Sequence, residues 1–312
     1  MRKITSVGIL GASGLLGDSL PSHIDSLDEI SFHVFQHRTS LNHFKNYCTV
    51  HSDFSVFLGE IDVLISFIPI WKLVSLLNPY SLHELELVRI VAVSSTSALT
   101  KIKSEDDWER GYAIQFLDSE VALTTLCHAS NCSLAIVRPT MIWGSGKDLN
   151  ISFIQRFISR FGFFILPSYG IGLRWPIHHF DLLTNIFDLA FRDSDSIYIA
   201  RGREELSYRE LIKRVFIWQH LRPVIFTLPS FIIPFAVFIA RVITSKPYIN
   251  SSSFRRIDCT ETQIMSDQNC LLSEHSFQPL HDKDVLRPSY VASFLNKLLS
   301  TVCTFGSKLS SH

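Results

Sequence analysis

The sequence predicts an α/β fold, in which a doubly wound parallel sheet of Rossmann type is accompanied by a smaller, mainly helical C-terminal lobe. Three observations lead to this class. An apolar segment near the N-terminus ends in closely spaced glycines, apolar segments then alternate with segments of helical length, and this alternation stops after about residue 220. We expect the first domain to span 1–165, with 176–202 returning to it, and the smaller lobe to comprise 166–175 and 203–312.

The first predicted strand lies in Ile4–Gly17 and runs into a glycine turn. Gly11 permits the turn, Gly14 lets a ligand approach bare backbone, and Gly17 lets the next helix pack closely on the strand. A strand, a glycine turn and a helix N-terminus in this order form a cradle for dinucleotide phosphates. The residues expected to line this cradle are Gly11, Ser13, Gly14, Leu15, Leu16 and Gly17.

Further apolar segments predict the rest of the sheet. The expected strands are Ser31–Phe35, Tyr47–His51, Ile61–Phe67, Leu87–Val93 and Cys132–Arg138, with Ser196–Ala200 as the last strand. Nearly all of Ile61–Phe67 is apolar, as in strands covered on both faces. Helices are expected at 71–84, 104–129, 150–161, 179–192 and 207–220. Ser104 is expected to open the longest, Asp181 to cap the fourth, and the capping box Ser207–Glu210 to begin the fifth.

Charge and cysteine content exclude several classes of function. Lys and Arg number 29 and so do Asp and Glu, and the basic residues are scattered, which argues against nucleic acid as a partner. None of the six Cys forms a CxxC pair, so we predict no metal site. Met1, Arg2 and Lys3 lead directly into the first strand, which favours a cytoplasmic protein without a cleavable signal peptide.

One apolar segment raises the question of membrane contact. Val224–Ala240 carries no charge and lies between Arg222 and Arg241. It is shorter than the roughly 20 residues that a membrane span needs, and two prolines interrupt it. We therefore expect a buried or surface-docking helix, and peripheral membrane contact stays open as the alternative.

Four motifs occur in an order that resembles the extended short-chain dehydrogenase/reductase superfamily, the NAD-dependent epimerase/dehydratase family. They are GASGLLG at Gly11–Gly17, SSTS at Ser94–Ser97, RPTMIWGSG at Arg138–Gly146 and PIHHFDLL at Pro176–Leu183. The resemblance covers about residues 4–215. It implies a protein that binds NAD(P) and acts as a nucleotide-sugar epimerase, dehydratase or reductase. By the same analogy, a homodimer would pair the helices that carry Tyr112.

The end of the second predicted strand bears on the choice of cofactor. NAD sites commonly place an acid there, to accept hydrogen bonds from the ribose. The residues here are Phe35-Gln36-His37-Arg38, and Arg38 would suit a 2′-phosphate, so NADP(H) is favoured over NAD(H). The resemblance further implies Asp53 near the adenine, and Ser66, Phe67, Ile68 and Pro139 beside the cofactor.

The catalytic residues of the family match only in part. The resemblance assigns its hydroxyl residue to Ser95, with Thr96 as a neighbour that would substitute, and its tyrosine to Tyr112. Phe116 stands where the lysine of Tyr-x-x-x-Lys is expected, and no tyrosine in the chain has lysine four residues later. In the family, the lysine ammonium stabilises the phenolate form of the tyrosine. Without it, three interpretations remain open: the protein catalyses no reaction, another residue such as Lys101 or Lys103 takes the place of the lysine, or the reaction needs only weak acid catalysis.

Three residues are candidates for the substrate side: Thr96, Arg174 and His178. Arg174 would bind a diphosphate or form a surface ion pair, and the resemblance places His178 beside a nucleotide sugar. The adjacent His178 and His179 lack a third ligand, which favours a structural role over a metal site. Two functions follow: a nucleotide-sugar enzyme, or a scaffold or sensor that binds NAD(P)(H) without turnover and associates with a membrane.

Overall fold

The chain divides into two compact units. The first contains Met1–Ser145, Ile177–Gly202 and Gln263–Glu274, and the second contains Gly146–Pro176, Arg203–Thr262 and His275–His312. The second unit thus begins at Gly146, and a late segment of the chain returns to the first. The computed structural model describes residues 3–25, 27, 29–36, 44, 46–80, 82, 87–192, 195–228, 256–260, 269–279, 285–297 and 299.

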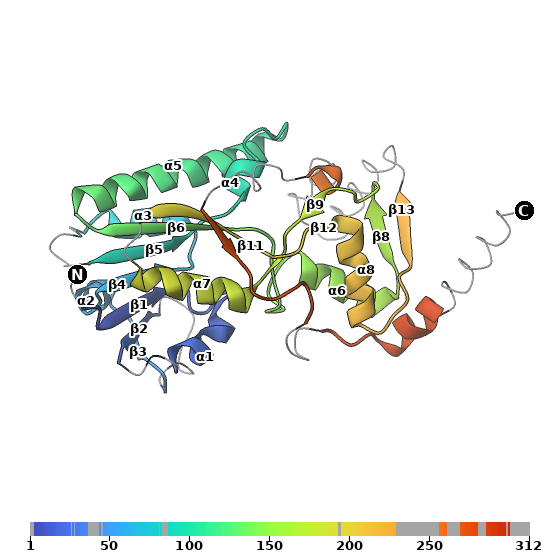
Figure 1. Cartoon of the computed structure of the whole chain (residues 1–312), viewed down its shortest axis with the longest axis horizontal. Helices are drawn as coiled ribbons and strands as arrows, with labels where there is room; N and C mark the ends of the chain where they lie inside the picture. The colour runs from blue at the N-terminus through green and yellow to red at the C-terminus, as the bar shows by residue number, and fades with distance from the viewer. Residues whose placement is uncertain are drawn as a thin grey trace, which may run out of the picture. The chain divides into compact units, whose positions relative to one another are not determined.

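The first unit is built on one sheet of eight parallel strands, as the fold class predicted (Figure 1). The strand order is β14-β11-β6-β5-β4-β1-β2-β3. The central strands are buried residue by residue, because both faces of the sheet are covered. Their bounds are β1 Ser6–Leu10, β2 Ser31–Phe35, β3 Thr49–His51, β4 Val63–Ser66, β5 Arg89–Val93, β6 Ser133–Pro139, β11 Ser196–Arg201 and β14 Cys270–Leu272.

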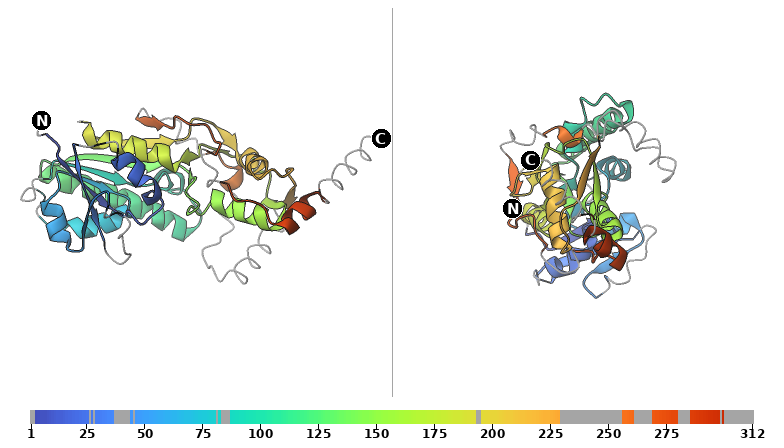
Figure 2. Two further views of the ribbon diagram at one scale, coloured as in Figure 1. Left: turned by 90° about the horizontal axis from the view of Figure 1, so that it is seen from below. Right: turned by 90° about the vertical axis from the view of Figure 1, so that its right-hand side faces the viewer.

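Helices cover both faces of this sheet, and each face has its own apolar cluster. On one face α1 and α7 pack over Val7, Ile9 and Val91, and on the other α2, α3 and α5 pack over Leu64 and Ile90. Figure 2 shows these layers from two further sides. The helices are η1 Gly17–Ser19, α1 Leu20–Ile24, α2 Phe54–Gly59, α3 Ile70–Leu77, α4 Ser97–Thr100, α5 Asp107–Ala129 and α7 His179–Phe191.

The direction of winding changes between β1 and β4. From β1 the chain continues to β2 and β3 on one side, and then returns to β4, β5 and β6 on the other. At such a switch point, the carboxyl ends of the two central strands border a crevice in which ligands of α/β proteins bind. In register, Leu10 pairs with Ser66 at these carboxyl ends.

The edge of the sheet differs from the prediction. Ser196–Ala200 was expected to be the last strand, but β14 pairs in parallel beyond β11, with Ile199 opposite Cys270. The expectation was wrong because β14 is only three residues long and lies in polar sequence. Its order comes from the tertiary pairing rather than from local propensity.

Two helices begin at residues other than the expected ones. α5 is capped by Asp106, whose side chain accepts the amide of Glu109 at 2.9 Å, whereas Ser104 donates to the Glu109 carboxylate. α7 is capped by His178 instead of Asp181, which accepts a hydrogen bond from Ser273. The backbone amides of the first helical turn need acceptors, and the Asp106 carboxylate in α5 and the His178 imidazole in α7 lie directly at the helix start and provide them.

The described part of the second unit contains the helices α6 and α8 together with paired short strands. α6 packs against α8, and α8 begins as predicted, with Ser207 accepting the amide of Glu210. β8 pairs in parallel with β13, and β9 pairs in antiparallel with β12. The bounds are β7 Ile142–Trp143 and β10 Ile177–His178 in the first unit, and α6 Ile151–Phe161, β8 Phe164–Pro167, β9 Leu173–Arg174, β12 Leu206–Ser207, α8 Tyr208–Trp218, β13 Ile225–Leu228 and η4 Arg256–Asp258 in the second.

The apolar segment Val224–Ala240 does not begin as a helix. Ile225–Leu228 forms β13, so the expected helix was wrong for these residues, and 229–240 lie outside the described residues. Among the helices that the structure describes, none has the length and apolar character to cross a membrane.

A buried carboxylate ties β1 to the start of β4. Oδ2 of Asp62 accepts the backbone amides and the side-chain hydroxyls of Thr5 and Ser6, at 2.8–3.0 Å. Burial acts to raise the pKa of Asp62, but these hydrogen bonds outweigh it and hold the pKa below its usual value. The carboxylate form is therefore the form that the fold stabilises.

We expect Asp62→Asn to lower the free energy of unfolding at pH 7 by about 1–3 kcal/mol, since hydrogen bonds to a charged acceptor are lost. Because the folded pKa lies below the unfolded one, this contribution is complete above about pH 4 and is lost as pH falls through the folded pKa. Urea unfolding of both proteins between pH 7 and pH 3 tests this, with the exposed Asp25→Asn as control. A difference that stays constant over this range would contradict the expectation.

Candidate functional site

The glycine turn after β1 has the backbone geometry that a phosphate cradle requires. Gly11 has a φ of +85°, which favours glycine, and its carbonyl accepts the amide of Gly14 at 2.9 Å. A Cβ on Gly17 would lie 1.7 Å from the carbonyl oxygen of Ala12, so the backbone closes tightly there. A Cβ on Gly14 would lie 3.0 Å from the carbonyl oxygen of Gly11, so all three glycines of the motif have a structural reason.

The outer side of this turn presents bare backbone. Ser13 and Gly14 are exposed, and within the described part of the chain the amides of Ser13 and Leu15 donate to no other group. The expected first helix is short, since η1 is followed by only five residues of α1. An anion here would therefore be bound chiefly by the amides of the turn, with little help from a helix dipole.

The end of β4 lies directly beside the turn. The amide of Phe67 donates to the carbonyl of Leu10 at 2.9 Å, and a Cβ on Gly11 would lie 3.2 Å from the amide nitrogen of Ile68. The hydroxyl of Ser66 is buried and has no hydrogen-bond partner among the described residues. The structure thus brings Ser66, Phe67 and Ile68 to the glycine turn at the switch point, where a polar ligand would satisfy the hydroxyl.

Only one of the two residues expected near the adenosine lies among the described residues. Arg38 lies outside the described residues. Asp53 caps α2, and its carboxylate accepts the Ser55 hydroxyl and the amides of Ser55 and Val56. These hydrogen bonds, the Ser55 hydroxyl first, hold the pKa of Asp53 below its usual value. Asp53 therefore has a structural role at the helix start.

The hydroxyl residues that follow β5 meet the end of β6. Thr96 is buried, and its hydroxyl and amide both donate to the carbonyl of Pro139, at 3.1 and 3.2 Å. Ser95 is half-buried, and its oxygen accepts the amide of Ser97 at 3.1 Å. Among the described residues the Ser95 hydroxyl donates to no group, so Ser95 is the better donor of the two.

Tyr112 belongs to an aromatic cluster on α3 and α5. Its ring contacts Trp71, Trp108 and Phe116 at centroid distances of 5.0–5.5 Å. Burial raises the pKa of the Tyr112 phenol, although the Lys101 ammonium lies 5.7 Å from the ring centroid. Nothing among the described residues activates this phenol as the family lysine would.

Phe116 occupies an apolar position in which a lysine would be unfavourable. Its side chain is 5% exposed, belongs to the apolar cluster under α5, and meets the Trp71 ring at 5.1 Å. An ammonium in this place would lose its hydration without a counter-charge, which is strongly unfavourable. Lys103, the second suggested substitute, is exposed.

A buried ionic network that sequence analysis did not anticipate lies between α5 and the ends of β5 and β6. Arg138 donates to both carboxylate oxygens of Glu120, through Nε at 3.0 Å and through Nη2. Ser94 donates to the same carboxylate. Because such a two-point pair fixes geometry, the network positions the strand ends that carry Ser95 and Pro139.

Like Thr96, the other two predicted substrate residues, Arg174 and His178, are engaged in local structure. In the second unit, Arg174 is buried rather than on the surface, and its Nη1 donates to the carbonyls of Leu173 and Cys259, each at 2.7 Å. In the first unit, His178 caps α7 by accepting the amide of Phe180 at 3.2 Å. Gly144 packs closely against it, since a Cβ there would lie 2.3 Å from His178 Nε2.

The parallel sheet with a glycine turn at its switch point defines a Rossmann-type α/β fold, and the comparisons with solved structures confirm this fold. One similar structure is a UDP-glucuronic acid 4-epimerase from Bacillus cereus in complex with UDP-glucuronic acid and NAD. It is 12% identical, covers 81% of this chain and 98% of its own, and has a TM-score of 0.57. No family model and no curated protein matches the sequence.

Two further structures show the same fold. A dTDP-glucose 4,6-dehydratase from Bacillus anthracis in complex with NAD is 13% identical over 72% of this chain and 84% of its own, with a TM-score of 0.56. MoeE5 in complex with UDP-glucose and NAD is 14% identical over 96% and 99%, with a TM-score of 0.55. At such identities the similarity establishes the fold and leaves the reaction to be argued from the site.

Proposed function

We propose that the first unit binds a nicotinamide dinucleotide, with its two phosphates on the amides of the turn Gly11–Gly17. The observation that carries this proposal is the turn itself, in which the amides of Ser13 and Leu15 donate to no other group among the described residues, and the buried hydroxyl of Ser66 lies at the neighbouring strand end. Similar structures were solved with NAD, which supports this class of cofactor. NADP(H) is favoured because the strand end Phe35-Gln36 lacks the acid that grips the ribose of NAD.

For the substrate we propose a nucleotide sugar, and for the reaction class an epimerase, dehydratase or reductase. Structures of this fold were solved with UDP-glucose and UDP-glucuronic acid. Ser95, at the end of β5, is the residue best placed to donate a proton or a hydrogen bond. Bound dinucleotide would supply hydride transfer, and this chain would orient it through the turn and the ends of β4 and β6.

A second candidate is binding of the dinucleotide without turnover, as a scaffold or sensor. Phe116 in the apolar core and the raised pKa of Tyr112 favour it, because the usual proton donor lacks its activating partner. General acid catalysis by such a group contributes about 10²–10⁴ in rate, so its loss would leave a slow enzyme or none.

Titration of the protein with NADPH and NADH by calorimetry tests the binding. We expect NADPH to bind more tightly, and Gly14→Val to weaken binding at least 10-fold, because a Cβ there would lie 3.0 Å from the Gly11 carbonyl oxygen and the larger side chain would crowd the turn. The control is Gly111→Ala, at an exposed helix position where a Cβ meets nothing within 4 Å. If neither dinucleotide binds at millimolar concentration, the proposal fails.

Turnover is tested with the same protein on UDP- and dTDP-sugars, by NADPH oxidation and by chromatography of the sugar products. If the protein is an enzyme, we expect Ser95→Ala to lower kcat at least 100-fold, whereas Tyr112→Phe keeps it within about threefold. Binding without any product would favour the scaffold or sensor. A large loss in Tyr112→Phe would show that the phenol acts despite its surroundings.

A further inference from the structure

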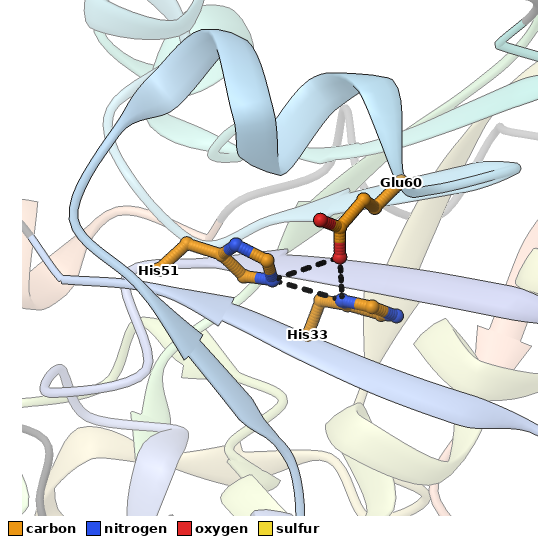
Figure 3. A group of neighbouring side chains, drawn as sticks. All are labelled: His33, His51 and Glu60. Carbon is orange, nitrogen blue, oxygen red and sulfur yellow. Dashed lines mark hydrogen bonds and ion pairs between the residues drawn. The ribbon is translucent and has the colours of Figure 1, made fainter.

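Two histidines and a glutamate meet at the edge of the sheet formed by β2 and β3 (Figure 3). In the register of these strands, His33 pairs with Thr49, and Phe35 pairs with His51. Side chains two positions apart share a face of a strand, so His33 and His51 project from the same face. The chain then passes through α2, and Glu60 at the end of that helix turns back toward both rings.

The three side chains converge on one point. His33 Nδ1 lies 2.9 Å from His51 Nε2, and the Oε2 atom of Glu60 lies 3.5 Å from the first and 3.7 Å from the second. Each residue therefore offers one ligand atom to the same small space. Among the described residues, this is the one group of at least three histidine, cysteine or acidic side chains with such a geometry.

These separations fit a tetrahedral zinc site. With zinc–nitrogen and zinc–oxygen bonds of about 2.0–2.1 Å, neighbouring ligand atoms of a tetrahedron lie about 3.3 Å apart. The three distances between these ligand atoms lie on both sides of that value, so the three atoms match one triangular face of a zinc tetrahedron. Two imidazoles and one carboxylate are also a donor set that divalent transition metals take, whereas magnesium and calcium prefer oxygen alone.

The two rings are shielded from water and oriented by their neighbours. Both histidines are 8% exposed. The other nitrogen of His33 lies 3.4 Å from the hydroxyl of Ser31, which orients the ring. The His51 ring packs at 5.8 Å against Phe57.

We propose that His33 Nδ1, His51 Nε2 and Glu60 Oε2 bind a zinc ion. The Glu60 side chain is 48% exposed, so the fourth position would be open to water. The ion would connect β2, β3 and the end of α2. Neither cysteine spacing nor the adjacent His178 and His179 contributes to this site, which depends on pairing between strands.

The test uses untagged, full-length protein freed of metal by a chelator and dialysis. We expect it to bind one equivalent of zinc, measured by competition with a chromophoric chelator and by elemental analysis. Cobalt should replace zinc and give the visible absorption of a tetrahedral nitrogen and oxygen site. Zinc at about 100 times its Kd should raise the Tm by about 5 °C.

Glu60→Gln is the decisive variant, because this exposed side chain can change without disturbing the core. It should weaken zinc binding at least 10-fold, and His33→Gln and His51→Gln should abolish it. His128→Ala and Glu205→Gln remove an exposed histidine and an exposed carboxylate elsewhere and should leave it unchanged. If the native protein binds no zinc, or if Glu60→Gln binds it as the native protein does, the two rings form only a hydrogen-bonded pair and the proposal is wrong.

Discussion

Gly17→Ala should lower the free energy of unfolding by about 3 kcal/mol or more and abolish dinucleotide binding. The added Cβ would lie 1.7 Å from the carbonyl oxygen of Ala12 and 2.7 Å from its carbonyl carbon. Both atoms are backbone, so no side chain can move aside. The turn must open, and the amides of Ser13 and Leu15 then lose the arrangement that would bind phosphates. Urea unfolding and NADPH titration measure the two effects.

Gly111→Ala provides the matched control for this substitution. Gly111 lies within α5 and is exposed, and a Cβ added there would have no other atom within 4 Å apart from its chain neighbours and the nearby backbone of its own helix. Alanine is a better helix former than glycine, so this variant should be more stable by up to about 1 kcal/mol and bind NADPH normally. A Gly17→Ala protein with native stability would show that the turn does not close on Ala12 as described.

The sheet could be predicted well because its signal is local. Ile61–Phe67 is almost wholly apolar, and the core of that segment is β4, buried on both faces. The glycine turn was also readable, since its three glycines follow a strand directly. β14 was missed, because three residues in polar sequence become a strand only when β11 provides the partner.

The candidate site could be predicted only where spacing along the chain was enough. Gly11, Ser66 and Ile68 come together because parallel strands end at a common edge, which the order of strands implies. The zinc ligands His33 and His51 are 18 residues apart and meet through strand register, which no local pattern encodes. Asp53 caps α2, a role that the family motif did not indicate, and its place near the adenine stays a prediction.

The burial of Glu120 could have been predicted from the sequence. Ala113, Phe116, Leu123 and Cys127 repeat at intervals that place them on one face of α5, and Glu120 falls on that face. An acid among apolar positions is rarely buried without a partner. Arg138 at the end of the sixth predicted strand was the available partner, and the structure pairs them.

Glu120→Ala should lower the free energy of unfolding by about 3–5 kcal/mol, because it leaves the guanidinium of Arg138 buried and unpaired. The Glu120 side chain is 3% exposed and that of Arg138 is 10% exposed, so water can compensate little. Ser94 also loses its acceptor. Denaturant unfolding gives the magnitude, and NADPH titration shows whether the ends of β5 and β6 keep their position.

The double variant Glu120→Leu with Arg138→Met separates the charge from the packing. Both replacements are apolar and keep much of the volume, so the double variant should recover most of the stability that Glu120→Ala loses. Its dinucleotide binding should nevertheless be weaker than that of the native protein, since the two-point pair that orients the strand ends is gone. If Glu120→Ala costs less than about 1 kcal/mol, the carboxylate is not the buried partner of Arg138, and another group positions these strand ends.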